Sequence, residues 1–531
     1  MIKNKMNKLI LLFGGLTLVG LASCTDLREE ALDGTIQSAS SGSVDTGGYL
    51  KAAVSGLNEF SGNGNMFALN EMSTDILAGP TRGGDWDDNG AWRQIHMQTW
   101  TKAHAHVRDS WNILLSQVYN CNQVIYNSAS ATEIIQARFL RAFYYYNIVD
   151  LFGQAPYREK GSDLNSDAKV WSRADATNFV ITELEAIVGS LPARTADASI
   201  INKDAANFLL AKLYLNKAVF TSSTPAGPYT FAAADMTKVV QYVDAINSSV
   251  APDYWDNFKP DNNTSPEILF SYKNTRGNGS NMQSRWRMGT HYNQYPSGWN
   301  GFAVIGEFYN TFNPSDRRIK NNDASVISNF GNVAGIIVGQ VRNGKNHDQF
   351  GRDQDDNKVK YTTLAANTLN VLDRNNHNLI FGDINNLIIS GAAIEGEGYR
   401  PMKYIPDAAN LDNPENDFVL FRYADALLMK AEAIKRGGSA GSGMSVAAIQ
   451  AVLTGRPGIT TSTDLTTLDG IYKARGNELW LEGWRRNDMI RFGKYTAAKK
   501  LKPTVSDAKV VLFPIPANAL LNPNLKQNDG Y

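Results

Sequence analysis

The spacing of apolar residues constrains the fold of this 531-residue chain more than any other feature. Apolar residues recur at three and four positions over two separated parts of the chain, which is the period of a helix that packs by one face. The predicted helices span 103–127, 133–152, 174–188, 204–220, 237–246, 418–435 and 468–491. Two blocks of helices should therefore pack pairwise, with a long middle segment between them.

Small alanines stand among large side chains in the predicted helices, as in 207–215 and 423–433. This pattern is typical of stacked helical hairpins. We therefore expect a mainly α fold with a tetratricopeptide-like scaffold. Residues 60–100 and 255–410 differ, because glycine, asparagine, aspartate and proline interrupt their short apolar runs, and we expect loops and short strands there. Irregular segments on a rigid scaffold are common places for ligand binding.

The amino terminus is typical of a lipoprotein leader. Three lysines precede an apolar run, Leu9–Leu21, that is too short to span a bilayer, and small residues then lead to Cys24. We predict a signal peptide over 1–23 and lipid, including palmitate, on Cys24, since several acyl chains on one cysteine give a durable membrane anchor. The alternative is an ordinary secretory leader that leaves Cys24 unmodified. The polar segment 24–48 is predicted to be a flexible tether, and 49–531 a single domain.

Composition excludes several classes of protein. Cys121 is the one cysteine left besides Cys24, so no disulfide framework is expected and the core must hold the fold, which 43% hydrophobic residues permit. Without the three leader lysines, 49 basic residues stand against 52 acidic ones, and this balance does not support nucleic acid binding through bulk charge. No later segment is long and apolar enough to be a predicted membrane span.

Four stretches of the chain carry a family resemblance. The strongest, RGNELWLEGWRRNDMIRFG at 475–493, resembles a helix of the SusD/RagB family. Similar matches lie at 138–153, at 422–433 and in the carboxy-terminal LFPIP and NPNLKQNDGY of 512–531. The departures are Phe492, where the family often has tryptophan, and Asp529, where proline is frequent. The matches cover nearly the whole chain.

The charged residues of the strongest stretch sit three or four positions apart, as in Glu478, Glu482 and Arg485. This spacing favours ion pairs along one face of a helix. A solvated charged face or a buried network of pairs explains it better than an active site.

The resemblance implies a function at the cell surface. Proteins of this family sit as lids on SusC-like TonB-dependent outer-membrane barrels, hold an oligosaccharide on aromatic side chains and deliver it as the lid closes. It also implies that acidic Asp26, Glu29 and Glu30 direct the lipoprotein to the outer face of the outer membrane. The alternatives are a peptide-binding member and a structural lid that touches no cargo. The identity, linkage and length of the glycan stay open.

A glycine-rich stretch, PTRGGDWDDNGAW at 80–92, is predicted to be a recognition loop, because glycines allow tight turns that present side chains outward. Tryptophan rings pack on the apolar faces of sugars, while carboxylates and guanidinium groups bond sugar hydroxyls. The run also resembles the T-R-x-G-D-W of glycan-binding members. The candidate ligand contacts are Arg82, Asp85, Trp86, Asp87 and Trp92. The alternative makes both tryptophans buried anchors of the loop.

A second aromatic group lies in the middle segment and is interleaved with polar residues rather than set at helical spacing. Its members are Trp286, His291, Tyr292, Tyr295 and Trp299, with Asn293, Gly298 and Asn300 among them. A surface platform competes here with an ordinary core, and Trp286, Tyr295, Trp299 and Asn300 are the candidate ligand contacts. Tyr399 and Arg400, after the glycine-rich turn 391–398, are expected to complete the site from a third segment.

No motif in the sequence specifically indicates catalysis. A hydrolase would need two carboxylates a set distance apart, and the candidates are Asp75, Asp85, Asp87, Asp88, Glu395 and Glu397. The G-x-S-x-G match at 437–441 lies in a Gly/Ser linker between predicted helices, not on a strand-to-helix turn. No phosphate-binding G-x-x-x-x-G-K-[ST] loop occurs. We expect a binding protein and not an enzyme.

The sequence gives similarly little support for metal binding. His96, His104 and His106 lack a companion cysteine or an H-E-x-x-H arrangement, so we expect ordinary histidines. The acidic clusters at Asp353, Asp355 and Asn357 and at Asp373, Asn375 and Asp383 have oxygen ligands that suit calcium. They lack the twelve-residue loop with glycine at its sixth position. Solvated loops are expected, with structural calcium as the alternative and no other cofactor.

Overall fold

The computed structural model describes residues 43–531 apart from 164, 345–349, 353–357, 361 and 364–368. Within it, Asp45–Tyr531 forms one compact unit. The predicted signal peptide, Cys24 and its acidic neighbours lie outside the described residues, as do Asp353, Asp355 and Asn357. In the described part of the chain, no helix has the length and apolar character needed to cross a membrane.

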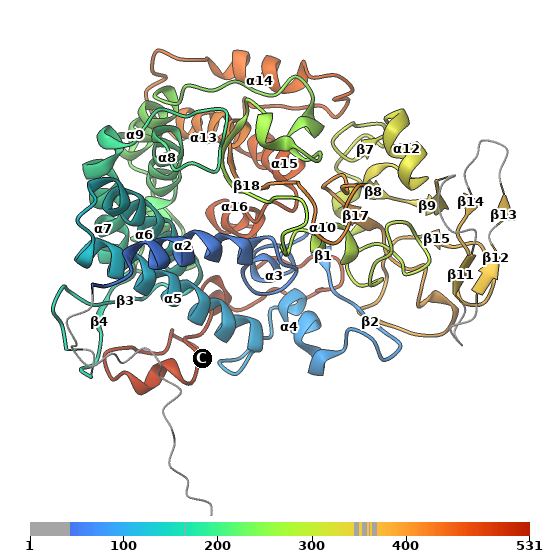
Figure 1. The fold of residues 1–531 in the computed structure, drawn as a ribbon, viewed down its shortest axis with the longest axis horizontal. Coiled ribbons are helices and arrows are strands. Elements are labelled where there is room, and N and C mark those ends of the chain that lie inside the picture. Colours follow the sequence, from blue (N-terminus) through green and yellow to red (C-terminus); the bar gives the residue numbers. More distant parts are fainter. Residues whose placement is uncertain (1–42, 164, 345–349, 353–357, 361, 364–368) are drawn as a thin grey trace, which may run out of the picture. The chain divides into compact units, whose positions relative to one another are not determined.

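Helices dominate the compact unit (Figure 1). The first block contains α2 (Thr46–Ser55), α3 (Asn65–Glu71), α4 (Ala91–Met97), α5 (Ala105–Asn127), α6 (Ala131–Leu151), α7 (Arg173–Ile187), α8 (Lys203–Phe220) and α9 (Ala233–Asp244). The second contains α13 (Tyr423–Lys435), α14 (Val446–Thr454), α15 (Leu468–Leu479) and α16 (Arg485–Arg491). The prediction of a mainly α fold is confirmed.

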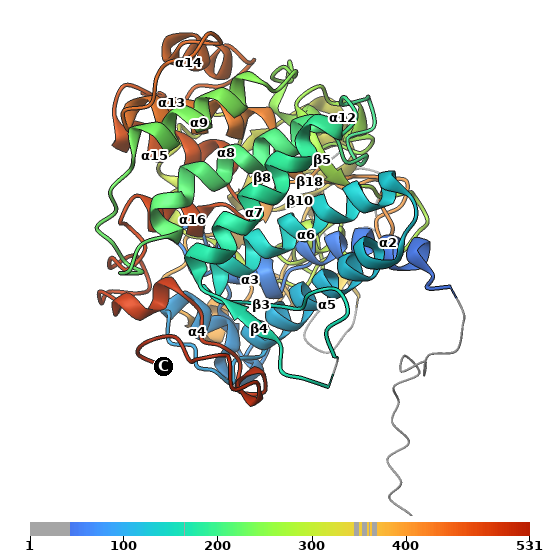
Figure 2. The same ribbon diagram turned by 90° about the vertical axis from the view of Figure 1, so that its left-hand side faces the viewer.

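The long helices pack in chain order. Helix α5 packs on α6, α6 on α7, α7 on α8 and α8 on α9, and α9 then packs on α13 of the second block (Figure 2). Side-chain caps fix several starts: Ser130, Ser172 and Asn202 each accept a hydrogen bond from a backbone N–H in the first turn of α6, α7 and α8. Pairwise packing matches the expected arrangement, and the tetratricopeptide-like detail stays a prediction.

The core joins the two blocks. Helices α6 and α8 are buried on nearly all sides over 139–151 and 204–216, so they form the centre of the scaffold. Phe421 stacks on Phe208 of α8 with ring centroids 4.4 Å apart. The second block is therefore held to the first through aromatic contact as well as through α9.

Two predicted helices are wrong in detail. Phe418–Arg422 is strand β18 and not the start of a helix, because its side chains are buried on both faces and its backbone pairs with β5 (Ile268–Tyr272). The predicted helix 468–491 breaks between α15 and α16, where Leu481 (φ 57°) and Gly483 (φ 82°) adopt left-handed backbone conformations that a right-handed helix cannot contain.

The middle segment folds into short strands and loops, as expected, and among its described residues also contains three short α-helices that were not predicted. Its helices are α10 (Ser284–Arg287), α11 (Gly306–Tyr309) and α12 (Ala324–Phe330). The remaining strands are β1 (Leu77–Ala78), β2 (Thr81–Arg82), β3 (Ala155–Tyr157), β4 (Lys169–Trp171), β6 (Ala303–Val304), β7 (Lys320–Asn321), β8 (Ala334–Ile337), β9 (Gly339–Gln340), β10 (Arg342–Asn343), β11 (Phe350–Arg352), β12 (Lys358–Lys360), β13 (Thr362–Thr363), β14 (Leu369–Asn370), β15 (Ile380–Phe381), β16 (Ile388–Ile389) and β17 (Arg400–Met402).

Two pairings bring the segment 77–92 onto this middle region. Strand β1 pairs antiparallel with β6, and β2 pairs parallel with β16. Strand β17 in turn pairs with β8. These short sheets place the predicted recognition loop beside the second aromatic group and beside the turn that precedes Tyr399.

The charged residues of 475–491 form a buried network. Arg475 lies between Asp425 and Asp488, each 2.9 Å away, and Arg491 contacts Glu432 at 2.7 Å. All five side chains are buried. Of the two interpretations of this stretch, the buried network is the one present, and most of its pairs join different elements rather than neighbours on one helix.

Candidate functional site

The structure brings two of the predicted segments together as an aromatic patch, which we define as Trp86, Trp92, Trp299 and Phe302. The ring of Trp86 lies 5.7 Å from Trp92, 6.5 Å from Trp299 and 4.9 Å from Phe302, measured between centroids. Trp299 is 40% exposed and Trp86 is half-buried, whereas Trp92 and Phe302 are buried beneath them. The patch therefore offers two indole rings to solvent on an aromatic base.

Trp86 is held rigidly within this patch. Its backbone is left-handed, with φ of 59°, and its indole Nε1 donates a hydrogen bond to the carbonyl oxygen of Trp299 at 3.0 Å. Its ring also packs on Gly301, where a Cβ would lie only 2.6 Å from two ring carbons. Glycine is thus required at 301 for the ring to approach.

Arg82 ties the recognition loop to the two other predicted segments. Its guanidinium is buried and donates to three carbonyl oxygens, those of Gly301 (3.0 Å), Ile394 (2.9 Å) and Glu397 (2.8 Å). Burial lowers the pKa of Arg82 to about 9, although the nearby Glu397 opposes the change. Arg82 therefore positions the site and does not itself reach solvent.

Arg400, in the third predicted segment, also positions the site. It is fully buried and donates to Asn300 Oδ1 (2.8 Å) and to the carbonyl oxygens of Gly398 (2.8 Å) and Glu395 (2.9 Å). Burial, reinforced by the neighbouring Arg82, lowers its pKa well below the usual value. The two guanidinium groups hold together three segments that are far apart in the sequence.

A polar rim flanks the rings. Asp85 is exposed, and Asp87 accepts a hydrogen bond from Arg93 at 2.6 Å. Asp88 accepts from the indole N–H of Trp92, and Asn89 beside it is exposed. Carboxylate, amide and guanidinium groups of this kind suit the hydroxyls of a ligand whose apolar face lies on the indoles.

Behind the patch lies a buried cluster of ionisable groups. His291 Nε2 is 3.0 Å from Glu395, which also accepts a hydrogen bond from Arg374 at 2.7 Å. Burial lowers the pKa of His291 to about 4, against the hydrogen bond to Glu395. Burial alone would raise the pKa of Glu395, but the contacts with His291 and Arg374 bring it to about 2. Glu395 is thus an ionised structural carboxylate.

The other predicted contacts are less accessible. Trp286 is fully buried and Asn300 is nearly so. Tyr295 is half-buried and stacks on Phe330 at 5.8 Å. Tyr399 is also half-buried, 5.0 Å from Tyr309. In this conformation the accessible candidates are Trp86, Trp299, Asp85 and Asp87, with Tyr295 and Tyr399 partly accessible.

Three neighbours of the patch escaped the sequence analysis. Phe302 forms its base, His106 packs on Trp92 at 4.4 Å, and Arg93 pairs with Asp87. Phe302 follows Trp299 by three residues, whereas His106 meets the patch from helix α5, 14 residues after Trp92. Arg93 directly follows the loop, and its charge close to three aspartates was an available sign.

The geometry of the described residues does not support hydrolysis or metal binding. Asp75 is paired with Arg485 at 2.7 Å, and Asp383 accepts a hydrogen bond from the backbone N–H of Gly306 and pairs with Lys500. Asp373 accepts hydrogen bonds from two backbone N–H groups of its own loop. Within the residues that the structure describes, no group of three or more His, Cys, Asp or Glu side chains is placed to hold a metal ion.

The remaining motifs fit the expected structural roles. The G-x-S-x-G match at 437–441 lies between α13 and α14. His96 is fully buried among the carbonyl oxygens of Met72, Leu77 and Lys500, and burial lowers its pKa to about 3.

Known proteins resemble this chain in both sequence and fold. A model described as the SusD family matches residues 266–509. The starch-binding protein SusD of Bacteroides thetaiotaomicron is 25% identical over 515 residues, covering 88% of this chain and 85% of that protein. The matched residues include most of the middle segment and the buried charge network.

Solved structures agree on the fold. A SusD superfamily protein from Parabacteroides distasonis superposes with a TM-score of 0.68 at 18% identity, covering 92% of this chain and 98% of that one. Surface glycan-binding protein A from Bacteroides thetaiotaomicron, solved in complex with laminarihexaose, gives a TM-score of 0.60 at 18% identity over 91% and 99% of the two chains. Family model, sequence relative and fold agree: this chain is similar in sequence and fold to proteins of the SusD/RagB family.

Proposed function

We propose that this protein binds a glycan on its aromatic patch at the cell surface and passes it to a SusC-like TonB-dependent transporter. The observation that carries the proposal is the exposed ring of Trp299 beside the rigidly held ring of Trp86, with a polar rim along one side. Sugar rings stack on such indoles through their C–H faces while their hydroxyls bond the rim.

The relatives support this choice of ligand. One is named for starch binding, and another was solved with laminarihexaose bound. Both are binding proteins by name, and we propose binding without catalysis here as well. The glycan of this protein is left open, because starch and laminarin differ in linkage.

The proposal is tested by titrating the purified full-length chain with a broad oligosaccharide panel that includes starch oligosaccharides and laminarihexaose. Trp299→Ala should weaken binding of the ligand so found by at least about tenfold, or about 1.4 kcal/mol. Val505→Ala, at a residue that is 73% exposed, is the matched control and should leave binding unchanged. Ligand recovered intact after long incubation would agree with the absence of catalysis.

Failure of every glycan to bind would reject the glycan proposal. Binding of peptides instead would favour the peptide-binding alternative, and co-purification with a barrel without any ligand would favour a structural lid. Undiminished binding by both Trp299→Ala and Trp86→Ala would reject only the assignment to the patch.

The anchor and the location are part of the proposal. We propose lipid on Cys24, a tether over 24–48 and an outward-facing position on the outer membrane. Radiolabelled palmitate should enter the wild-type chain and not the Cys24→Ala variant. Protease added to intact cells should remove the protein, and its survival there would contradict the location.

A further inference from the structure

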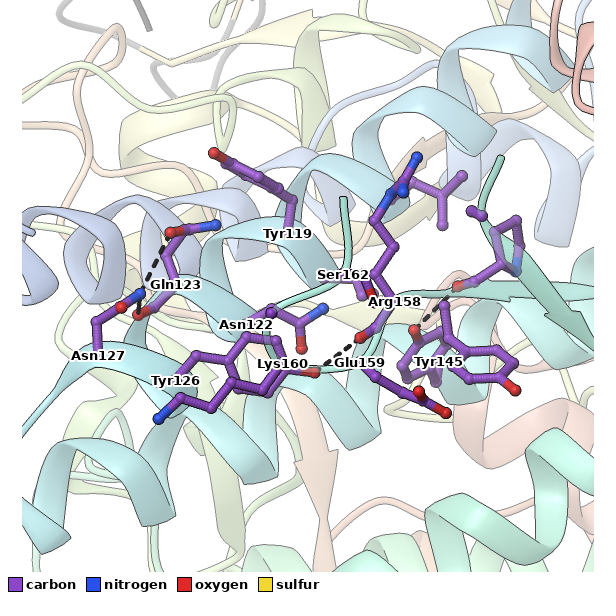
Figure 3. Close-up of a pocket in the computed structure, with 16 residues that line it drawn as sticks. Tyr119, Asn122, Gln123, Tyr126, Asn127, Tyr145, Arg158, Glu159, Lys160 and Ser162 are labelled. Atoms are coloured by element: carbon purple, nitrogen blue, oxygen red, sulfur yellow. Dashed lines mark hydrogen bonds between the residues drawn. The ribbon is translucent and has the colours of Figure 1, made fainter. Parts of the chain in front are cut away.

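A cavity lies on the helical scaffold, away from the aromatic patch. It has a volume of about 530 Å³ and opens between one face of α5 and the loop that joins β3 to β4 (Figure 3). Seven of its lining residues fall on one stripe of α5, from Leu115 to Asn127, and Tyr145 of α6 contributes to its floor. A volume in the range of about 300–1,000 Å³ is typical of small-ligand sites.

This groove, defined by its lining residues on α5 between 115 and 127 and by loop residues 156–162 and 168, is separate from the patch. Trp92 of the patch packs on His106, at the start of α5. Gln123 of the groove follows 17 residues later on the same helix, a separation of roughly 25 Å at the helical rise of about 1.5 Å per residue. The nearest groove residue on α5, Leu115, is roughly 14 Å from His106 at the same rise, so the amide groups of the groove lie farther from the patch than a short oligosaccharide extends.

Hydrogen bonds hold the wall of the groove in place. The Tyr126 hydroxyl donates to the carbonyl oxygen of Arg158 at 2.8 Å, and the Tyr145 hydroxyl donates to that of Pro156 at 3.0 Å (Figure 3). Tyr157 stacks on Trp171 with centroids 3.9 Å apart and an interplanar angle of 6°. The cavity is thus built by specific contacts between the loop and the two helices.

Two of the three charged side chains that line the groove, Arg158 and Glu159, are held by neighbouring residues, and Lys160 is the third. Arg158 donates to the carbonyl oxygens of Asp163 (2.9 Å) and Ser166 (2.6 Å), which closes its own loop. Glu159 pairs with Lys169 at 3.0 Å. A charged ligand would have to displace these contacts, whereas the Lys160 ammonium can donate to a hydroxyl of a neutral ligand.

Amide and tyrosine groups dominate the remaining polar surface. The buried Asn122 accepts a hydrogen bond from Arg141 at 2.8 Å through its oxygen, and its amide nitrogen has no hydrogen-bond partner among the described residues. Gln123 contributes a second amide, and Tyr119, which is 42% exposed, forms part of the mouth. Flat rings and amides, which both donate and accept, match the C–H faces and hydroxyls of a sugar.

We infer that this groove is a second saccharide site, which takes a neutral oligosaccharide of two or three sugar units. An acyl chain would leave the amides of Asn122 and Gln123 without partners, and an extended peptide would need an open run of backbone groups that the α5 wall does not offer. The site goes beyond the proposed function and does not depend on the aromatic patch. With this groove, the protein would have two separate binding sites for a long glycan.

The test uses the full-length chain with both exposed rings of the patch removed, Trp86→Ala/Trp299→Ala. Isothermal titration with neutral trisaccharides (glucose trimers linked α-1,4, β-1,3 and β-1,4, and β-1,4 trimers of xylose and mannose) should show one-to-one binding of at least one of them. Adding Tyr119→Ala should weaken that binding at least tenfold, and adding Gln123→Leu should do so without enlarging the cavity.

Tyr49→Ala is the matched control, because Tyr49 makes the edge-to-face contact with Tyr119 (6.1 Å) but does not line the groove. It should change trisaccharide affinity less than twofold. Thermal unfolding of each variant checks that the fold is kept. Absence of binding by every trisaccharide, or equal binding by the Tyr119→Ala and Tyr49→Ala chains, would overturn the inference, as would a Tyr119-dependent affinity for short peptides or fatty acids alone.

The two proposals fail in different ways. If only the patch assignment is wrong, Trp299→Ala leaves binding unchanged in the otherwise wild-type chain. If only the groove assignment is wrong, the chain lacking both patch rings binds no trisaccharide while the wild type still binds longer glycans.

Discussion

Arg491 of the helical scaffold and Arg82 and Arg400 of the loop-rich binding region show two opposite ways of burying a guanidinium group. In the scaffold, Arg491 contacts the carboxylates of Glu432 and Asp488, both 2.7 Å away. In the binding region, Arg82 and Arg400 donate mainly to backbone carbonyl oxygens, and no ion pair to either is present among the described residues.

The difference follows from the secondary structure. Helices use most of their own carbonyl oxygens, so the guanidinium of Arg491, buried between helices, is paired with acidic side chains. Loops leave carbonyl oxygens pointing inward, and a buried guanidinium with five N–H donors can satisfy several of them. Arg82 and Arg400 are thus connectors between segments that share no long strands.

The largest effect is expected from Arg491→Met in the scaffold. Removing this guanidinium leaves Glu432 and Asp488 as buried carboxylates with one partner fewer, which costs about 3–5 kcal/mol. The free energy of unfolding in denaturant measures the loss. Lys169→Met is the control, because its pair with Glu159 is more than half exposed, and it should change stability by less than about 1 kcal/mol. Equal effects of the two variants would remove the contrast between buried and exposed pairs.

Arg82→Met should have a smaller effect on stability and a larger one on ligand binding. The carbonyl oxygens of Gly301 and Ile394 lose their guanidinium donor, at about 1–3 kcal/mol for each group left unsatisfied, but no buried charge is left unpaired. We expect a loss of about 2–3 kcal/mol in the same denaturant experiment and glycan affinity at least tenfold weaker. A loss as large as that of Arg491→Met, with binding intact, would contradict the connector role.

The smallest effect is a pH dependence that belongs to the binding region. His291 faces Glu395, Arg374 and Arg400, and burial holds its pKa near 4 in the folded chain, against about 6.5 when unfolded. As pH falls below 6.5, only the unfolded chain takes up this proton, so stability falls towards pH 4. Between pH 7 and pH 5 this histidine removes about 2 kcal/mol.

His291→Gln should therefore lose about 2 kcal/mol less than the wild type over that interval, as measured by denaturant unfolding at each pH. Asp488 in the scaffold provides the contrast, since contacts with Arg475 and Arg491 overcome the effect of burial and lower its pKa to about 2. It stays ionised throughout the interval. Parallel pH profiles for wild type and His291→Gln would rule out this source of acid sensitivity.

Much of the scaffold was predictable because its helices show the period of one buried face, as in α5 and α7. The errors at Phe418–Arg422 and Leu481 have physical causes. A strand buried on both faces has the same apolar run as a buried helix. The left-handed turn at Leu481 belongs to a break between two helices whose charged side chains are held by distant elements, and no local breaker residue marks it except Gly483.

The binding region was predictable by residue type but not by orientation. The loop around Trp86 was found because glycine, tryptophan and aspartate occur together, and Trp299 because aromatic and polar residues alternate around it. Whether Arg82 and Arg400 point outward depends on carbonyl oxygens at 394–398, which sequence spacing does not place. The groove was not predicted at all, because residues 115–127 show only the pattern of a helix and the loop over them lies elsewhere in the chain.

The way Trp86 is fixed has a consequence for recognition. A free indole loses rotamer freedom when a ligand captures it, at about 0.5–1.5 kcal/mol for each immobilised side chain. The Nε1 hydrogen bond to Trp299 and the close contact with Gly301 remove that freedom while the chain folds. The ring of Trp86 is thus preorganised for stacking before a ligand binds.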